Sequence, residues 1–70
     1  MTEEERRVTI ILLNYARGKY SLAHIKGVLA RGLKHLETTR FAVDPDFIAN
    51  LAAIERAIKI IEEKQKETSQ

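Results

Sequence analysis

The sequence predicts an all-α fold, a single three-helix bundle that spans residues 1–70. In three segments the apolar residues recur at the helical spacing of three and four positions, and residues typical of helix ends separate these segments. The apolar content of 44% is too high for a disordered chain, and 70 residues are too few for two hydrophobic cores. We therefore expect one small helical domain.

The first helix is predicted over about residues 3–17. Thr2 and Glu5 have the spacing of a capping box, and the acids between them suit the positive end of a helix dipole. Gly18 is the residue type that most often adopts a left-handed conformation after a helix, so we expect the helix to end near Arg17. A short turn follows.

The second helix is predicted over about residues 22–37. Ser21 is a favourable N-cap, and Tyr20 lies where it can form a hydrophobic staple with Ile25. Gly32 lies beside the apolar stripe, where we expect it to let a neighbouring helix approach closely, with the alanine row of the third helix as the candidate. The stripe expected to face the core consists of Leu22, Ile25, Leu29, Leu33 and Leu36, flanked by Val28 and Gly32.

The third helix is predicted over about residues 45–64. Asp44 is the expected N-cap, Pro45 takes the first helical position, and Val43 can form a staple with Ile48. The polar residues 65–70 are expected to fray. Two adjacent apolar rows predict contact with two neighbouring helices; they consist of Phe47, Leu51, Ile54, Ile58 and Ile61, and of Ala49, Ala53, Ala57 and Ile60.

The first helix has apolar residues on two sides. One stripe contains Val8, Ile11, Leu12 and Tyr15, whereas Ile10 and Leu13 project from nearly the opposite side. These two side chains are either simply exposed, as single aliphatic residues often are, or buried in a homodimer that enlarges a small core. The predicted oligomer interface consists of Ile10, Leu13, Ala49, Ala53 and Ile60.

Positive charge is concentrated in the middle of the chain. The net charge is only +2, but residues 17–40 contain six lysines and arginines against one acid, Glu37. Such local fields attract polyanions, and a helix, a short turn and a basic second helix also match the outline of a helix-turn-helix. The predicted nucleic-acid-binding residues are Arg17, Lys19, His24, Lys26, Gly27, Arg31, Lys34, His35 and Arg40.

Two functions fit these patterns. The first is a dimeric, non-catalytic regulator that binds nucleic acid, DNA rather than RNA, through the basic face of the second helix. Gly27 would leave an unobstructed patch of backbone within that face, unless it is merely a tolerated glycine. The alternative is a protein–protein interaction module, such as a small subunit, adaptor or inhibitor, that docks on an acidic partner through its apolar helix surfaces.

Several other classes of function are disfavoured. The chain has no cysteine, and His24 and His35 are eleven residues apart, about 16 Å along a helix, so one chain cannot place both on one metal ion. No catalytic or cofactor motif occurs, so we expect no enzyme and no cofactor. The apolar runs are far shorter than the roughly 20 residues of a membrane span, and the acidic start is unlike a signal peptide. We expect a cytoplasmic protein with no membrane partner.

Overall fold

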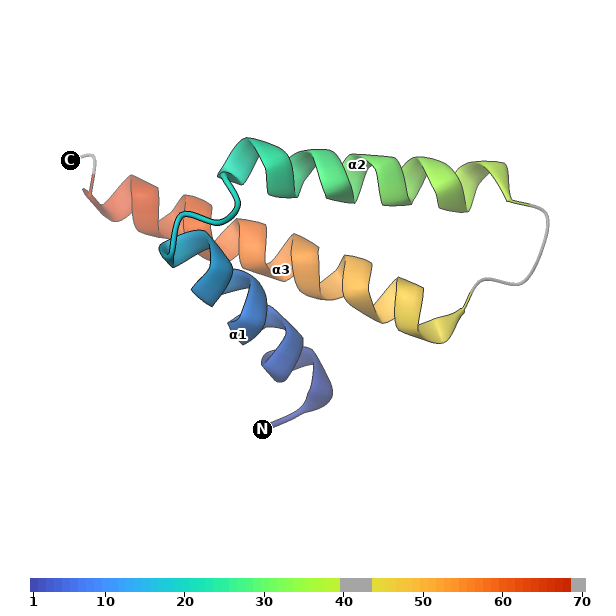
Figure 1. Cartoon of the computed structure of the whole chain (residues 1–70), viewed down its shortest axis with the longest axis horizontal. Coiled ribbons are helices and arrows are strands. Elements are labelled where there is room, and N and C mark those ends of the chain that lie inside the picture. The colour runs from blue at the N-terminus through green and yellow to red at the C-terminus, as the bar shows by residue number, and fades with distance from the viewer. Residues whose placement is uncertain (40–43, 69–70) are drawn as a thin grey trace.

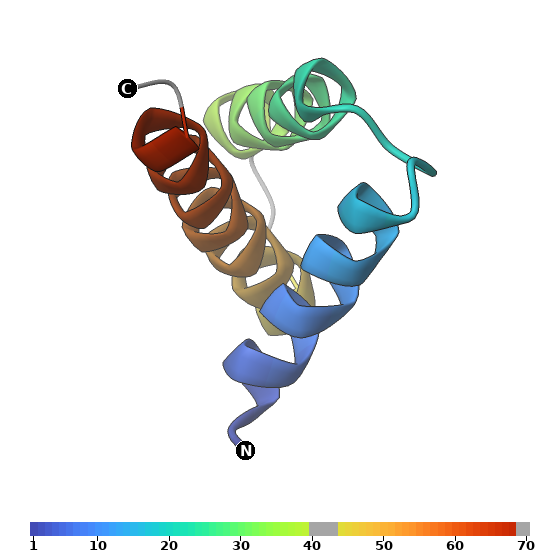
Figure 2. The same ribbon diagram turned by 90° about the vertical axis from the view of Figure 1, so that its left-hand side faces the viewer.

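The computed structural model describes residues 1–39 and 44–68 and confirms the all-α prediction. It contains three helices, α1 (Glu3–Ala16), α2 (Leu22–Thr38) and α3 (Pro45–Thr68) (Figure 1). Helices α1 and α2 both pack on α3 but diverge from the turn that joins them, so they contact each other little (Figure 2). None of the helices in these two ranges combines the length and the apolar character that a membrane span requires.

The three predicted N-caps are present. At each helix start a side-chain oxygen accepts a hydrogen bond from a backbone N–H that has no partner inside the helix. These bonds explain why the helices begin within one residue of the predicted positions. They join Thr2 Oγ1 to Glu5 N at 3.1 Å, Ser21 Oγ to His24 N at 3.1 Å and Asp44 Oδ1 to Asp46 N at 2.9 Å.

The turn between α1 and α2 depends on a left-handed glycine, as predicted. Gly18 has a φ of +77° and donates its N–H to the carbonyl of Tyr15 at 3.0 Å. Lys19 donates to the carbonyl of Asn14 at 3.0 Å. This pair of bonds is the Schellman arrangement, and it reverses the chain so that α2 can return along α3.

Helix α3 extends four residues beyond its predicted end near residue 64. The hydroxyl of Thr68 donates to the carbonyl of Lys64 at 3.2 Å, and the amide of Gln65 donates to the hydroxyl of Tyr15 at 3.3 Å. The contact with α1 helps to hold this polar turn in helical form, so residues 65–68 are not a frayed tail. Residues 40–43 and 69–70, which include Val43 of the predicted staple, lie outside the described residues.

The core divides between the two apolar rows of α3. Val8 of α1 packs against Ala53 and Ala57, which have no exposed surface. Ile25 of α2 packs instead against Ile58 and Ile61 of α3, and these three residues form a second cluster. The small alanine side chains let α1 approach closely, and the larger isoleucines fill the wider space under α2. The prediction that the third helix contacts two neighbours is therefore confirmed.

The packing of α2 confirms one prediction and corrects two. A Cβ built on Gly32 would overlap Leu51 Cδ2, so the missing side chain does allow close contact with α3. The partner is Leu51, however, rather than the predicted alanine row. Leu33, predicted to face the core, is 45% exposed because it lies at the edge of the α2 stripe and α1 diverges from α2.

Candidate binding surface

Where α1 and α2 diverge over α3, residues of all three helices line an open groove. Three hollows of about 230, 410 and 400 Å³ make up this groove. They adjoin one another, because Val28 and Ile54 line both the first and the second, while Asn50 lines both the second and the third. The groove therefore runs continuously along α3.

Each helix contributes one side of the groove. The floor comes from α3 with Asn50 and Ile54, one wall comes from α1 with Ile11 and Asn14, and the other comes from α2 with Val28. The helical phase places these residues next to the core stripes, where a third neighbouring helix would cover them. The main apolar side chains of the groove are Ile10, Ile11, Val28, Phe47, Leu51 and Ile54.

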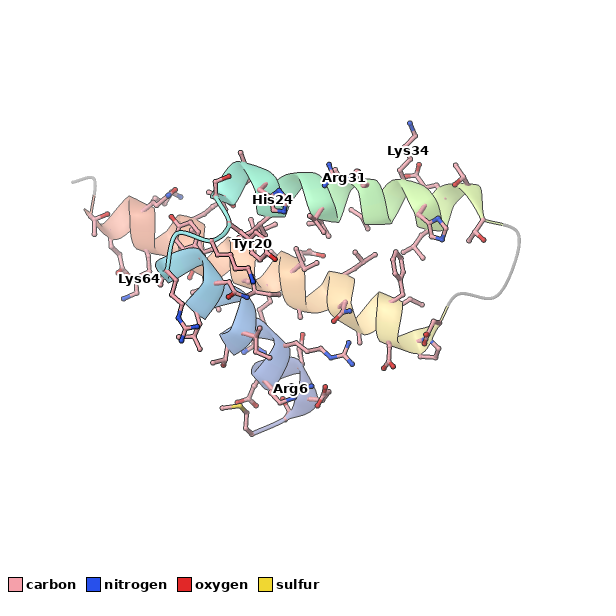
Figure 3. The ribbon with its side chains drawn as sticks, viewed as in Figure 1. Arg6, Tyr20, His24, Arg31, Lys34 and Lys64 are labelled. Carbon is pink, nitrogen blue, oxygen red and sulfur yellow. The ribbon has the colours of Figure 1, made fainter. Side chains whose placement is uncertain are left out.

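Cationic and imidazole side chains form the α2 edge of the groove. His24, Arg31 and His35 share one side of the helix and all line the groove. The His24 ring stacks on Tyr20 with centroids 5.0 Å apart (Figure 3). The His35 ring meets Phe47 edge-on, with centroids 5.4 Å apart. These ring contacts hold both histidines at the rim of the groove, where both residues are still exposed.

Most cations of α1 and α3 are paired with acids of the same chain. The pairs include Arg7 with Asp46 at 3.2 Å and Arg56 with Glu4 at 3.6 Å. In the middle of the chain, Lys26 pairs with Glu62 of α3 at 2.7 Å. Four cations form no ion pair with any described residue, and we call them the unpaired cations: Arg17, Lys19, Arg31 and Lys34.

The structure separates the predicted nucleic-acid-binding residues into groups. Arg31 and Lys34 lie on the exposed part of α2, and Lys34 extends away from the bundle (Figure 3). Lys26 lies roughly 140° around the helix from Arg31 and is engaged by α3. The remaining predicted residues are Arg17 and Lys19 in the turn, His24 and His35 at the groove, and Arg40, which lies outside the described residues.

Gly27 does not present the unobstructed backbone that the sequence suggested. A Cβ built on it would lie 3.4 Å from Nη1 of Arg31, so the guanidinium already covers this part of α2. The i,i+4 spacing of the two residues explains the contact, because the long side chain of Arg31 reaches back over the preceding turn. Arg31, rather than the glycine backbone, is the accessible group here.

The predicted oligomer interface also divides. Ile10 and Leu13 are 45% and 48% exposed, which leaves both accessible to a second chain. Ala53 is fully buried beneath Val8, and Ile60 packs against the same cluster. Because α1 of the same chain covers this row, Ala53 is not accessible to a second chain. Ala49 is partly buried.

The strongest titration effect lies at the start of α1. Hydrogen bonds from Arg6 and then Arg7 lower the pKa of Glu3 to about 2. The same carboxylate raises the pKa of Arg6. This exposed cluster organises the first turn of α1 through charge-assisted bonds. No group of three metal-ligating side chains is brought together anywhere in residues 1–39 and 44–68.

The sequence contained no signal for the groove itself. Helical phase did not select Asn14 and Asn50, and it placed Val28 only at the flank of the core stripe. A phase argument shows which side of a helix a residue occupies but not the angle between two helices. No protein-family model matches this chain, and no significant match is found among curated proteins or solved structures.

Proposed function

We propose that this protein is a non-catalytic regulator that binds nucleic acid through α2 and the turn before it. The observation that carries the proposal is the concentration of the unpaired cations in residues 17–34, while most cations of α1 and α3 are paired. The acid beside a paired cation repels a phosphate and so reduces the attraction between the cation and the nucleic acid. An unpaired cation attracts the phosphate fully and displaces the counterions bound to the nucleic acid.

The shape of α2 supports duplex DNA over duplex RNA. The helix has 17 residues and is covered mainly by α3, so its opposite side is accessible along its length (Figure 1). The major groove of B-DNA admits an α-helix, whereas the major groove of A-form RNA is too narrow for one. A homodimer formed through Ile10 and Leu13 would double the phosphate contacts, and a cytoplasmic location fits this role.

The test compares two matched double variants in fluorescence anisotropy with labelled duplex DNA and single-stranded RNA. Arg31→Ala with Lys34→Ala removes two unpaired cations from α2. Lys59→Ala with Lys64→Ala removes two cations that pair with acids on α3. We expect the first variant to weaken DNA binding and to reduce its salt dependence by about two counterions, and the second to do neither. Equal effects of both variants would contradict the proposal.

A second candidate function is a protein–protein interaction module. It is favoured by the exposure of Ile10 and Leu13 on α1. A subunit, adaptor or inhibitor would bury this pair against another protein. Ile10→Asp with Leu13→Asp should then abolish self-association or partner capture while leaving DNA binding by a single chain intact.

A further inference from the structure

We infer that the groove between α1 and α2 binds one acidic amphipathic α-helix of a partner protein. The groove is continuous and mainly apolar along α3, and its lining includes Ile11, Val28 and Ile54. The inference does not depend on nucleic-acid binding, because these three apolar side chains are distinct from the unpaired cations and only Arg31 adjoins both surfaces. It identifies a second surface of the same small protein.

The walls of the groove favour a helix over an extended segment. The floor and both walls are helices whose backbone groups form hydrogen bonds within the helix, so they offer no free edge to which a strand could add. An extended peptide would lie there with its own N–H and C=O groups unpaired, whereas a helix satisfies them internally. The three adjoining hollows also suit successive anchor side chains at i, i+3 or i+4, and i+7.

The charges around the groove favour an acidic helix. The α2 edge carries the unpaired Arg31 between His24 and His35. At the opposite end the one acid among the lining residues, Asp46, is already paired with Arg7 at 3.2 Å. Arg31, whose guanidinium lies over Gly27 at the rim, therefore gives the α2 edge one positive charge that forms no ion pair with a described acid. A glutamate flanking the apolar face of a bound helix would supply the opposite charge.

The same charges argue against a second copy of this chain as the occupant. The exposed apolar side of α1, with Ile10 and Leu13, is the helix surface that a copy would offer. Helical phase places the unpaired Arg17 between those two residues on that same side. A copy docked in this way would bring Arg17 to the edge that carries the unpaired Arg31, and like charges in close contact oppose association.

The experiment uses the full chain labelled with ¹⁵N and three designed peptides of about 18 residues, or five helical turns. The first peptide has leucines at alternating spacings of four and three with glutamates elsewhere. The second replaces glutamate with lysine, and the third keeps the composition of the first but scrambles the spacing. We expect only the first peptide to bind, with amide shifts that include Ile11, Val28 and Ile54, and with affinity that falls as salt rises.

Matched variants locate the binding site. Val28→Gln on α2 and Ile54→Gln on α3 should each weaken peptide binding about tenfold, because each removes an apolar contact that the peptide would bury. Leu33→Gln and Ile48→Gln replace residues of the same two helices that are 45% and 50% exposed and do not line the groove, so they should have no effect. Arg31→Gln should weaken binding about two- to fivefold.

The outcomes are distinguishable from those for nucleic acid. Lys34→Ala should weaken DNA binding and leave peptide binding unchanged, whereas Val28→Gln should do the reverse. The inference is overturned if the basic or scrambled peptide binds as well as the acidic one, or if no peptide shifts the groove amides. It is also overturned if duplex DNA shifts the Val28 and Ile54 amides instead, or if dilution alone shifts them, which would identify a second copy as the occupant.

Discussion

Gly27 and Gly32 lie on the same helix but have different neighbours. Gly32 packs directly on Leu51 of α3, where a Cβ would also lie 3.3 Å from Cδ1. A Cβ on Gly27 would meet only the flexible guanidinium of Arg31, at ordinary contact distance. The first glycine is therefore required by packing, and the second is not. The two positions offer a matched pair of identical substitutions.

Gly27→Ala should stabilise the protein by about 0.5–1 kcal/mol, because alanine has the higher helix propensity and the Arg31 side chain can move aside. Gly32→Ala should destabilise it by about 1–3 kcal/mol, since the new methyl group overlaps the buried side chain of Leu51, which must shift to make room. Urea unfolding monitored by circular dichroism measures both free energies. A stabilising effect of Gly32→Ala would contradict the close packing of α2 on α3.

The carboxylate of Glu3 gives stability a dependence on acid pH. Arg6 and Arg7 lower its pKa from 4.5 to about 2 in the folded chain. The unfolded chain therefore takes up this proton first, and the stabilising effect, fully present above pH 4.5, is lost as the pH falls toward 2. Glu3→Gln should flatten the thermal stability curve in that range. Glu63→Gln, which changes an exposed acid with no ion pair among the described residues, should not.

For the helices, local chemistry was enough to predict where each begins and where α1 ends. Ser21 and Gly18 act through bonds to residues at most four positions away, so their effect can be read from neighbouring letters. The end of α3 was predicted too early because Gln65 bonds to Tyr15, which is distant in sequence. Leu33 was placed in the core because periodicity does not show how wide a stripe the neighbouring helix covers.

The left-handed turn after α1 provides a test of such local chemistry. Gly18→Ala should destabilise the protein by about 1–2 kcal/mol, because a Cβ is unfavourable at a φ of +77° even though no other atom lies within 4 Å of its position. Gly18→Asn should cost less, since asparagine tolerates this conformation. Chemical unfolding of the two variants makes the comparison. Equal losses of unfolding free energy in the two variants would indicate that the added side chain, rather than the φ angle of residue 18, causes the destabilisation.

In the molecule as a whole, α3 is the helix that organises the other two. Its alanine row packs against Val8 of α1 and its isoleucine row against Ile25 of α2, while Ile11 and Leu12 of α1 contact both clusters. The sequence predicted both rows, but the angle at which α1 and α2 separate depends on how side chains such as Val8 and Ile25 fit against them. The groove is a result of that angle, which is why it emerged only from the structure.

The proposed homodimer can be tested through the dependence of stability on concentration. Within one chain Ile10 and Leu13 are about half exposed, so Ile10→Gln with Leu13→Gln should change the unfolding free energy of a monomer by less than about 1 kcal/mol. In a dimer that buries both residues, the Tm should rise with protein concentration, because association stabilises only the folded state. The double variant should remove that rise.

Sedimentation equilibrium on the same samples separates a dimer from a larger assembly. Leu33→Gln with Ile48→Gln is the matched control, because it removes two aliphatic side chains of similar exposure from α2 and α3. We expect this control to retain the concentration dependence of the wild type. A wild-type Tm that is constant across concentrations, with a monomeric mass throughout, would contradict the dimer. Nucleic-acid binding would then depend on the four unpaired cations of a single chain, with a correspondingly smaller salt dependence.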